Sequence, residues 1–104
     1  MGKDVYIDFG VQIGDNVKIL WGDIIKGNIL IGENSTIESS VNMTGSDEFP
    51  LRIGKNVLIK GSSYLFGSIV GDGVSIEHSV WIKKKIKAEK DKNGNIKPVR
   101  FFIP

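Results

Sequence analysis

The chain has 104 residues, a hydrophobic content of 40%, a charged content of 25% and a net charge of +2, values typical of one soluble domain with a modest core. It has no cysteine, which excludes disulfides, thiolate metal sites and cysteine nucleophiles. The N-terminus lacks the apolar core of a signal peptide, and no apolar run approaches the roughly 18 residues of a membrane helix. We therefore expect a cytoplasmic protein without a membrane partner.

Aliphatic residues recur along the chain at a spacing of six. The spacing has two exceptions: ten residues from Met43 to Ile53 and five from Leu65 to Val70. Neither a helix period of 3.6 nor plain strand alternation predicts this spacing. The full set is Ile7, Ile13, Ile19, Ile25, Ile31, Ile37, Met43, Ile53, Ile59, Leu65, Val70, Ile76 and Ile82.

A longer period lies on top of the hexads, because every third one carries a turn signal. The stretches are "IGDNV" at Ile13, "IGENS" at Ile31, "IGKNV" at Ile53 and "VGDGV" at Val70. Their fourth residue is Asn16, Asn34, Asn56 or Gly73, and both residue types tolerate a left-handed backbone. A second set of corners has glycine at Gly27, Gly45 and Gly67. This recurrence predicts three flat sides per turn.

We therefore predict an all-β fold, a three-sided parallel β-helix of about four coils over residues 1–87. The fourth residue after most of the aliphatics is small or β-branched and is expected to point inward as well: Val11, Val17, Ser35, Val41, Val57, Ser63, Val74 and Val80. The aliphatics should form three internal ladders: Ile7, Ile25, Met43, Leu65 and Ile82; Ile13, Ile31, Ile53 and Val70; and Ile19, Ile37, Ile59 and Ile76.

The units "IGDNVK", "IGENST", "IGKNVL" and "VGDGVS" resemble the hexapeptide repeat of the left-handed β-helix transferases. That family includes CoA-dependent acyltransferases, carbonic anhydrase-like metalloproteins and the C-terminal domains of sugar-nucleotide pyrophosphorylases. The stretch "GSIVGDGVSIEHSVWI" most resembles the last group. The resemblance implies left-handed coiling and a homotrimer, but the repeat builds the prism and not the chemistry.

Two features interrupt the repeat in its first half. Asp23 occupies an inward position, so either the chain shifts and Ile24 turns inward, or Asp23 has a specific partner. The insertion "NMTGSDEFPLR" at residues 42–52 contains loop-forming residues and offers Asp47, Glu48 and Arg52. Related acyltransferases use such loops to shape an active site, and a tolerated surface insertion is the alternative.

Three aromatic residues are expected to cluster on the outside of two adjacent coils: Tyr64, Phe66 and Trp81. A solvated surface rarely carries such a patch without using it. The family resemblance favours a subunit interface there, and coverage by the C-terminal segment of the same chain is the alternative.

His78 is the only histidine and falls at a predicted corner, in line with Trp21, Ser39 and Gly61. A carbonic anhydrase-like site needs three histidines, so that function is excluded, and no metal-ligand spacing is present. Family acyltransferases use a histidine as general base, a role that suits imidazole near neutral pH. His78 is therefore the candidate catalytic residue, and a polar surface residue is the alternative.

The C-terminal segment differs from the body in charge. Residues 1–82 hold 6 basic and 10 acidic side chains, and residues 83–104 hold 8 basic and 2 acidic ones. Lys83, Lys84 and Lys85 are candidates for binding the phosphates of CoA or a nucleotide, with a solvated surface as the alternative. The chain has few arginines and no interleaved aromatic residues, which argues against nucleic-acid binding.

Residues 88–104 are expected to form a cap after the repeat. Asn93-Gly94 is a strong turn signal and predicts a two-stranded hairpin that packs on the last coil. Phe101, Phe102 and Ile103 would then cover the open end. The abrupt end at Pro104 raises the expectation that the chain is a fragment of a longer one.

Two functions remain open. The first is a trimerising scaffold domain of the hexapeptide-repeat transferase family, linked to sugar-nucleotide or acyl-transfer metabolism. The second is a small CoA-dependent acyltransferase with His78 as general base at a subunit interface, which would take CoA or acyl-CoA as its cofactor. The sequence therefore leaves open whether the chain is an enzyme, and a nucleotide-sugar is a further possible ligand.

Overall fold

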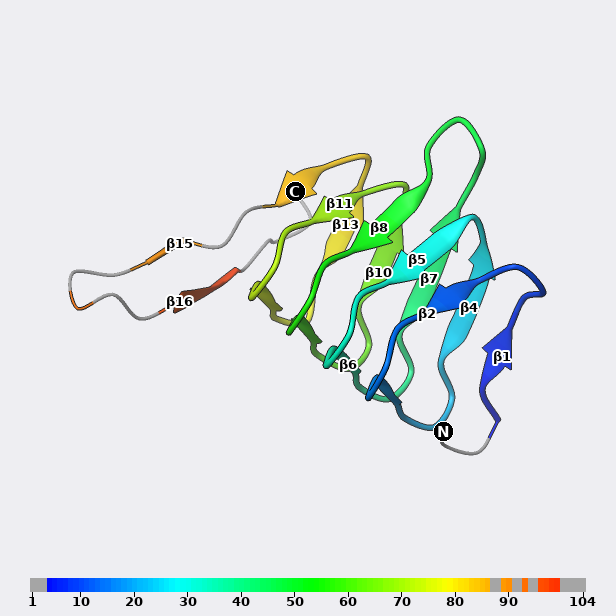
Figure 1. Ribbon diagram of the computed structural model, residues 1–104, viewed down its shortest axis with the longest axis horizontal. Coiled ribbons are helices and arrows are strands. Elements are labelled where there is room, and N and C mark those ends of the chain that lie inside the picture. The colour runs from blue at the N-terminus through cyan, green and yellow to red at the C-terminus, as the bar shows by residue number, and fades with distance from the viewer. Residues whose placement is uncertain (1–3, 87–88, 91–92, 94–95, 100–104) are drawn as a thin grey trace.

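The computed structural model describes residues 4–86, 89–90, 93 and 96–99. Its described strands form three sheets, which are the sides of a triangular prism and are parallel except for the strand β15 (Figure 1). Sheet A contains β1 (Tyr6–Ile7), β4 (Ile24–Gly27), β7 (Asn42–Gly45), β10 (Tyr64–Phe66) and β13 (Val80–Ile82). Sheet B contains β2 (Gln12–Ile13), β5 (Ile29–Ile31), β8 (Leu51–Ile53), β11 (Ile69–Val70) and β14 (Lys85–Ile86). Sheet C contains β3 (Lys18–Ile19), β6 (Thr36–Ile37), β9 (Leu58–Ile59) and β12 (Ser75–Ile76), followed by β16 (Ile96–Val99) and β15 (Glu89–Lys90).

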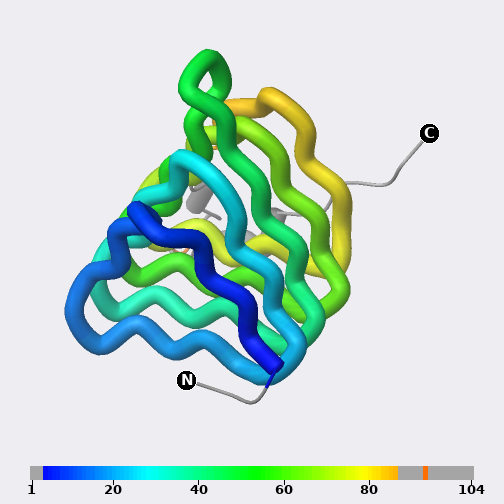
Figure 2. The backbone as a smooth tube through the Cα atoms, turned by 90° about the vertical axis from the view of Figure 1, so that its right-hand side faces the viewer, coloured from blue at the N-terminus to red at the C-terminus, as the bar shows by residue number. Residues whose placement is uncertain are grey.

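The predicted solenoid is confirmed, with about four coils and left-handed winding. Figure 2 views the prism from its N-terminal end, and the chain runs counterclockwise as it recedes from the viewer. Each coil binds the next through backbone hydrogen bonds, such as Lys18 N–H to the Ser35 oxygen at 3.0 Å and Thr36 N–H to the Val57 oxygen at 2.8 Å. Within the described residues there is no helix long and apolar enough to span a membrane.

The corner between sheets B and C has the predicted left-handed backbone. Asn16, Asn34, Asn56 and Gly73 have φ angles of 58°, 61°, 57° and 75°. Asparagine and glycine adopt this conformation at the lowest cost, so the residue type fixes where the chain turns. The N–H groups of Asn34, Asn56 and Gly73 each bind a carbonyl of the preceding coil, at 2.8–3.0 Å.

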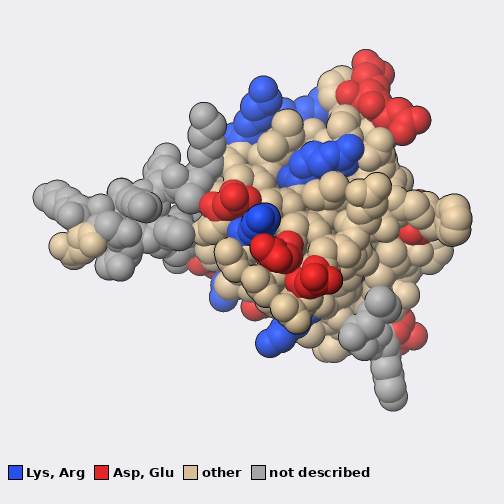
Figure 3. Space-filling view, in the orientation of Figure 1, with Lys and Arg blue, Asp and Glu red and all other residues tan. Residues whose placement is uncertain are grey.

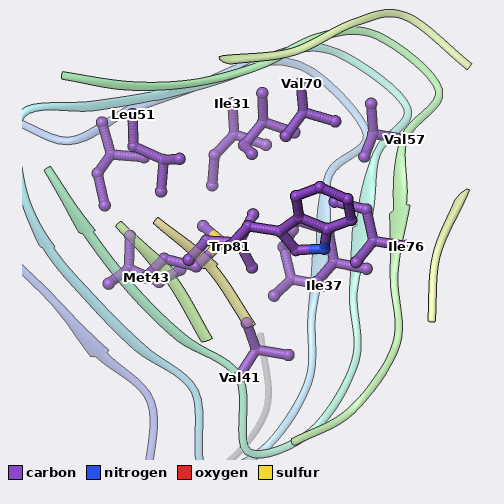
Figure 4. Packing of buried hydrophobic residues seen from close by; sticks show 14 of the residues in the cluster. Ile31, Ile37, Val41, Met43, Leu51, Val57, Val70, Ile76 and Trp81 are labelled. Atoms are coloured by element: carbon purple, nitrogen blue, oxygen red, sulfur yellow. The ribbon is translucent and has the colours of Figure 1, made fainter. Parts of the chain in front are cut away.

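The three aliphatic ladders point inward as predicted, with one exception at the last coil. Most of their members are buried to within 4% exposure, and Figure 4 shows the side chains packed inside the prism. The exception is Ile82, which is 49% exposed, whereas Trp81 is 8% exposed and pairs with Leu65. Trp81 therefore completes the ladder of Ile7, Ile25, Met43 and Leu65.

The inward position of Trp81 corrects the prediction that it lies on the outer surface. From Ile59 to Leu65 the chain takes six residues, but from the paired Ile76 to Trp81 it takes five. One missing residue reverses the alternation of all side chains that follow in the strand. For the same reason Ser79 points inward in place of Val80, and its hydroxyl accepts a hydrogen bond from Trp81 Nε1–H at 2.9 Å.

The predicted C-terminal hairpin is confirmed for its strands. β15 pairs antiparallel with β16, with Glu89 opposite Lys97 and Lys90 opposite Ile96. β16 also continues sheet C, because it pairs in parallel with β12. The predicted cover of Phe101, Phe102 and Ile103 lies outside the described residues.

Asp23 keeps its inward position and has a specific partner, so the second of the two alternatives is confirmed. Its side chain is fully buried, and Oδ1 accepts the Val41 N–H at 2.8 Å. Its Oδ2 is buried and has no hydrogen-bond partner among the described residues. Burial raises the pKa of Asp23 to about 6, although backbone hydrogen bonds from Val41 and Leu20 act in the opposite direction.

The buried carboxyl predicts a pH-dependent stability. Because its pKa is higher in the folded state than in the unfolded chain, the acid form favours folding, and this contribution is lost as the pH rises from about 4 to 6. Asp23→Asn resembles the neutral acid and should be more stable than the wild type at pH 7 by on the order of 1–3 kcal/mol, with little difference at pH 4. Urea unfolding at both pH values measures the difference. The exposed Asp15→Asn is the control, and equal pH slopes for the wild type and Asp23→Asn would contradict the argument.

Candidate functional site

His78 lies at the corner between sheets C and A, on the outside of the prism. Its Nδ1 is hydrogen-bonded to the backbone oxygen of Gly61 on the preceding coil. A carbonyl oxygen can only accept, so Nδ1 carries a proton, and in the neutral imidazole Nε2 then holds the free lone pair. The hydrogen bond therefore fixes the tautomer in which an exposed Nε2 can accept a proton.

The neighbours predicted for His78 form one column along this corner. Ser40 N–H binds the Trp21 oxygen and Ser62 N–H binds the Ser39 oxygen, both at 3.1 Å. A Cβ atom on Gly61 would lie 2.9 Å from the Ser39 oxygen, so the coils approach closely there. Trp21 is 62% exposed and is the large apolar side chain of the column.

The insertion forms a projecting loop at the opposite edge of sheet A, at the corner between sheets A and B (Figure 1). Its base is fixed by Asn28, which the sequence did not single out. Asn28 Nδ2–H donates to Asp47 Oδ1 at 3.2 Å, and Asn28 Oδ1 accepts from Arg52 Nη1 at 2.9 Å. Asn28 thus joins two of the three predicted loop residues, while Glu48 is exposed at the tip.

The loop is docked by Phe49, a second residue that the sequence analysis missed. The Phe49 and Phe66 ring centroids lie 6.4 Å apart, and Lys83 Nζ lies 4.2 Å from the Phe49 centroid. A Cβ atom on Gly67 would lie 2.7 Å from the Phe49 Cβ atom. Glycine at position 67 therefore makes room for the loop, and its φ of 56° also favours glycine.

A groove of about 560 Å³ runs along the same corner beneath the loop. Gln12, Asn28, Ser46 and Asp47 supply its polar side chains, and Phe9 stands fully exposed at its edge. Gly27 and Gly45 form part of its floor. A Cβ atom on Gly27 would lie 1.9 Å from the Gly45 oxygen, so the stacking of the coils alone explains these glycines.

The three lysines of the predicted phosphate site are all exposed, near the loop. Lys83 contacts Phe49 through its ammonium group, as described above. On sheet B, Ile69 pairs with Arg52 on one side and Lys85 on the other, so these two cations share the outer face. Figure 3 shows acidic side chains at the end of the projecting loop and basic side chains beside it on this face.

The structure thus separates the predicted site residues into two groups. Lys83, Lys84 and Lys85 lie near the insertion at one edge of sheet A, and His78 lies at the other edge. Tyr64 and Phe66 lie on the outer face between these edges, while Trp81 does not. Among the described residues, no group of three or more His, Asp or Glu side chains is arranged to hold a metal ion.

Comparison with known proteins finds one matching family model and several similar proteins. Residues 50–82 match the family model "Hexapeptide repeat of succinyl-transferase". The bifunctional protein GlmU of Listeria welshimeri is 36% identical over 74 residues, which is 71% of this chain and 15% of that protein. GlmU of Geotalea uraniireducens is 38% identical over 74 residues, with the same coverage, and GlmU of Clostridium botulinum is 31% identical over 88 residues, or 85% of this chain and 18% of that protein.

The chain therefore spans between 15% and 18% of the length of these relatives. No solved structure gives a significant match. The matches confirm the predicted resemblance to the hexapeptide-repeat transferases.

Because the loop packs closely against Gly67, we expect Gly67→Ala to destabilise the fold. The added methyl meets Phe49 and requires a strained backbone, so the free energy of unfolding should fall by about 1–3 kcal/mol. Gly10→Ala is the matched control, because Gly10 has a φ of 95° but no atom within 4 Å of the added Cβ, so it carries only the backbone cost. Urea unfolding compares the two, and amide chemical shifts of residues 46–49 should change in Gly67→Ala alone. Equal losses of stability would show that Phe49 does not depend on Gly67.

Proposed function

We propose that this hexapeptide-repeat domain, similar to part of the bifunctional GlmU proteins, acts mainly as a scaffold that forms a homotrimer. The observation that carries the proposal is the apolar outer face of sheet A. A sheet face of this kind stays unpartnered in few soluble proteins, whereas a closed ring of copies buries it.

The face is built by two adjacent coils. Tyr64 pairs with Val80 and Phe66 pairs with Ile82, so four apolar side chains form one block. Tyr64 and Ile82 are 36% and 49% exposed. The missing residue before Val80 moved Trp81 inward, and it also turned Val80 and Ile82 outward, so the patch keeps its apolar character with different members.

The outer face of sheet C has a different composition. Glu38 and Lys60 lie 4.0 Å apart there as an ion pair, and three of the four outward strand positions in the ladder of Lys18, Thr36, Leu58 and Ser75 are polar. Such a face is well solvated and gains little from association. The contrast between the two faces supports sheet A as the interface.

The proposed metabolic role is a link to sugar-nucleotide or acyl-transfer metabolism. It is supported by the similarity to the bifunctional GlmU proteins and by the sequence resemblance to the C-terminal domains of sugar-nucleotide pyrophosphorylases. The exposed lysines at positions 83–85 would meet the phosphates of a nucleotide-sugar or of CoA. Binding of UDP-sugars or CoA to the wild type and to a variant with all three lysines changed to glutamine measures this contribution.

The proposed ring predicts a mass of three times the 11.4 kDa chain by light scattering at micromolar concentration. Tyr64→Glu and Ile82→Glu should each shift the protein to the monomer, because the contact would desolvate an unpaired charge. Leu58→Glu is the control, since Leu58 faces outward on sheet C of the same coil as Tyr64. A monomeric wild type, or a trimer that survives both substitutions, would refute the proposed interface.

A second candidate function is acyl transfer from acyl-CoA, with His78 as general base. The observation that favours it is the hydrogen bond from Nδ1 to the Gly61 oxygen, which presents Nε2 to an acceptor hydroxyl or amine. Histidine bases that are oriented through one ring nitrogen accept the proton at the other. In this case CoA is the cofactor, and the subunit interface supplies the remainder of the site.

If His78 is the base, His78→Ala should lower kcat for acetyl transfer by about 10²-fold or more, the usual scale for a lost general base. The thermal stability should change little, because His78 is exposed and loses one surface hydrogen bond. Glu77→Gln, on the same corner, is the control and should keep its activity. Activity that survives His78→Ala, or no binding of CoA at millimolar concentration, would exclude this function.

A further inference from the structure

The corner that carries His78 differs from the other corners between sheets C and A, because it is one residue shorter. In the first three coils the chain turns there at a residue with a left-handed backbone. These residues are Gly22, Ser40 and Ser62, with φ angles of 76°, 61° and 60°. In the fourth coil none of residues 77–80 has a positive φ. The residue that is missing from this corner is therefore the left-handed one.

The side chain of His78 replaces the hydrogen bond that the missing residue would make. In the second and third coils the N–H of the left-handed residue donates to the coil before it, for example from Ser62 to the Ser39 oxygen at 3.1 Å. The next bond of this series would end at the Gly61 oxygen. His78 Nδ1 is hydrogen-bonded to that oxygen instead. The imidazole thus stands where the other coils have a backbone N–H.

Two serine hydroxyls fix the backbone on both sides of His78. The Ser79 hydroxyl donates to the Glu77 oxygen, which belongs to the peptide group before the histidine. The Ser79 N–H, which belongs to the peptide group after the histidine, donates to Ser63 Oγ at 3.3 Å. A side chain holds its orientation when the groups around it are themselves held by hydrogen bonds. Both peptide groups next to His78 meet this condition.

The two hydroxyls are in turn held inside the prism. Ser63 and Ser79 are 2% and 7% exposed. Trp81 Nε1–H donates to Ser79 Oγ at 2.9 Å, so the proton of that hydroxyl is directed to the carbonyl described above. Ser63 Oγ–H donates at 2.8 Å to the oxygen of Lys60, the residue before Gly61. A buried hydroxyl with a fixed donor and a fixed acceptor has one orientation, so this network joins the corner of the histidine to the corner of its acceptor.

We propose that Ser79 and Ser63 are positioning residues for His78, which hold Nδ1–H on the Gly61 oxygen and fix Nε2 as the outward atom that accepts a proton. What Nε2 acts on rests on the proposed acyl transfer. In that reaction Nε2 takes the proton of the acceptor hydroxyl or amine as its oxygen or nitrogen bonds to the acyl carbon. The bond from that carbon to the CoA sulfur breaks, and the proton passes to the sulfur.

Nitrogen NMR of the His78 ring tests the positioning without any substrate, and His78 is the only histidine of the untagged chain. At pH 9, where an ordinary imidazole is neutral, the wild type should carry the proton on Nδ1, whereas a free histidine favours Nε2. Ser79→Ala and Ser63→Ala should each shift the ring toward the tautomers of free histidine. A wild type with the proton on Nε2, or a Ser79→Ala ring identical to the wild type, would overturn the proposal.

Ser35→Ala is the matched control, at the corner between sheets B and C. Ser35 is fully buried, and its hydroxyl donates to the Gly54 oxygen at 2.8 Å and accepts the Val57 N–H at 3.1 Å. The control therefore loses as many hydrogen bonds of a buried hydroxyl as Ser79→Ala does. Both variants should lower the urea midpoint to a similar extent, but Ser35→Ala should leave the tautomer of His78 unchanged. An equal shift of the ring in both variants would show a general loss of stability and reject the positioning role.

Acetyl transfer distinguishes this proposal from the function on which it rests. Ser79→Ala should lower kcat by about 10-fold and leave the KM for acetyl-CoA unchanged, because a misplaced base slows the chemical step and not binding. Ser35→Ala should keep the kcat of the wild type. An unchanged kcat in Ser79→Ala would reject the positioning role and keep acyl transfer. A wild type with the proton on Nδ1 but no transfer would reject acyl transfer and keep the fixed ring.

Discussion

Each coil of the prism must bind its neighbours through the backbone along its whole length, and the rest of the structure depends on this requirement. The coils stack in register, with Ile25 opposite Met43 and Ile31 opposite Ile53. A side chain that points inward on one coil therefore lies above an inward side chain of the next. This is why one residue type repeats at each ladder position, and why the corners need asparagine or glycine at fixed places.

The same requirement decides where the chain tolerates a change in length. Four extra residues leave the prism at the corner between sheets A and B, where they form the loop, and β8 resumes in register with β5. One missing residue at the corner between sheets C and A is also absorbed there, but it reverses the inward and outward residues of β13. Trp81 enters the core through this reversal, and its indole N–H finds Ser79 as a partner.

The fold could be predicted from the sequence because the hexapeptide pattern recurs in every coil. The ladders and the left-handed corners follow from patterns that recur in every coil. The hairpin strands follow from Asn93-Gly94, which is a specific turn signal. The position of Trp81 could not be predicted, because a spacing of six to Ile82 and a spacing of five to Trp81 are both consistent with the aliphatic pattern. Only the pairing of Tyr64 with Val80 distinguishes them. Asn28 was missed because Asp47 and Arg52, its partners, lie 19 and 24 positions away along the chain. Phe49 was missed because Phe66 and Lys83 lie 17 and 34 positions away.

The function of the chain is harder to predict from the sequence, because the hexapeptide repeat determines the three sheets of the prism and not the residues of a site. The candidate polar residues lie at the corners of the prism, and they fall at two different corners: His78 at one and Lys83 at the other. His78 precedes the strand of sheet A, and Lys83 follows it. The five residues of chain from His78 to Lys83 span roughly 17 Å at 3.3 Å per residue, so one copy cannot use both on a small acceptor. In the proposed ring, however, sheet A is the contact face, and its two edges meet the neighbouring copies. The histidine of one copy then approaches the loop and lysines of another. The scaffold and the acyl-transfer proposals are thus connected, because assembly would be the step that completes a site.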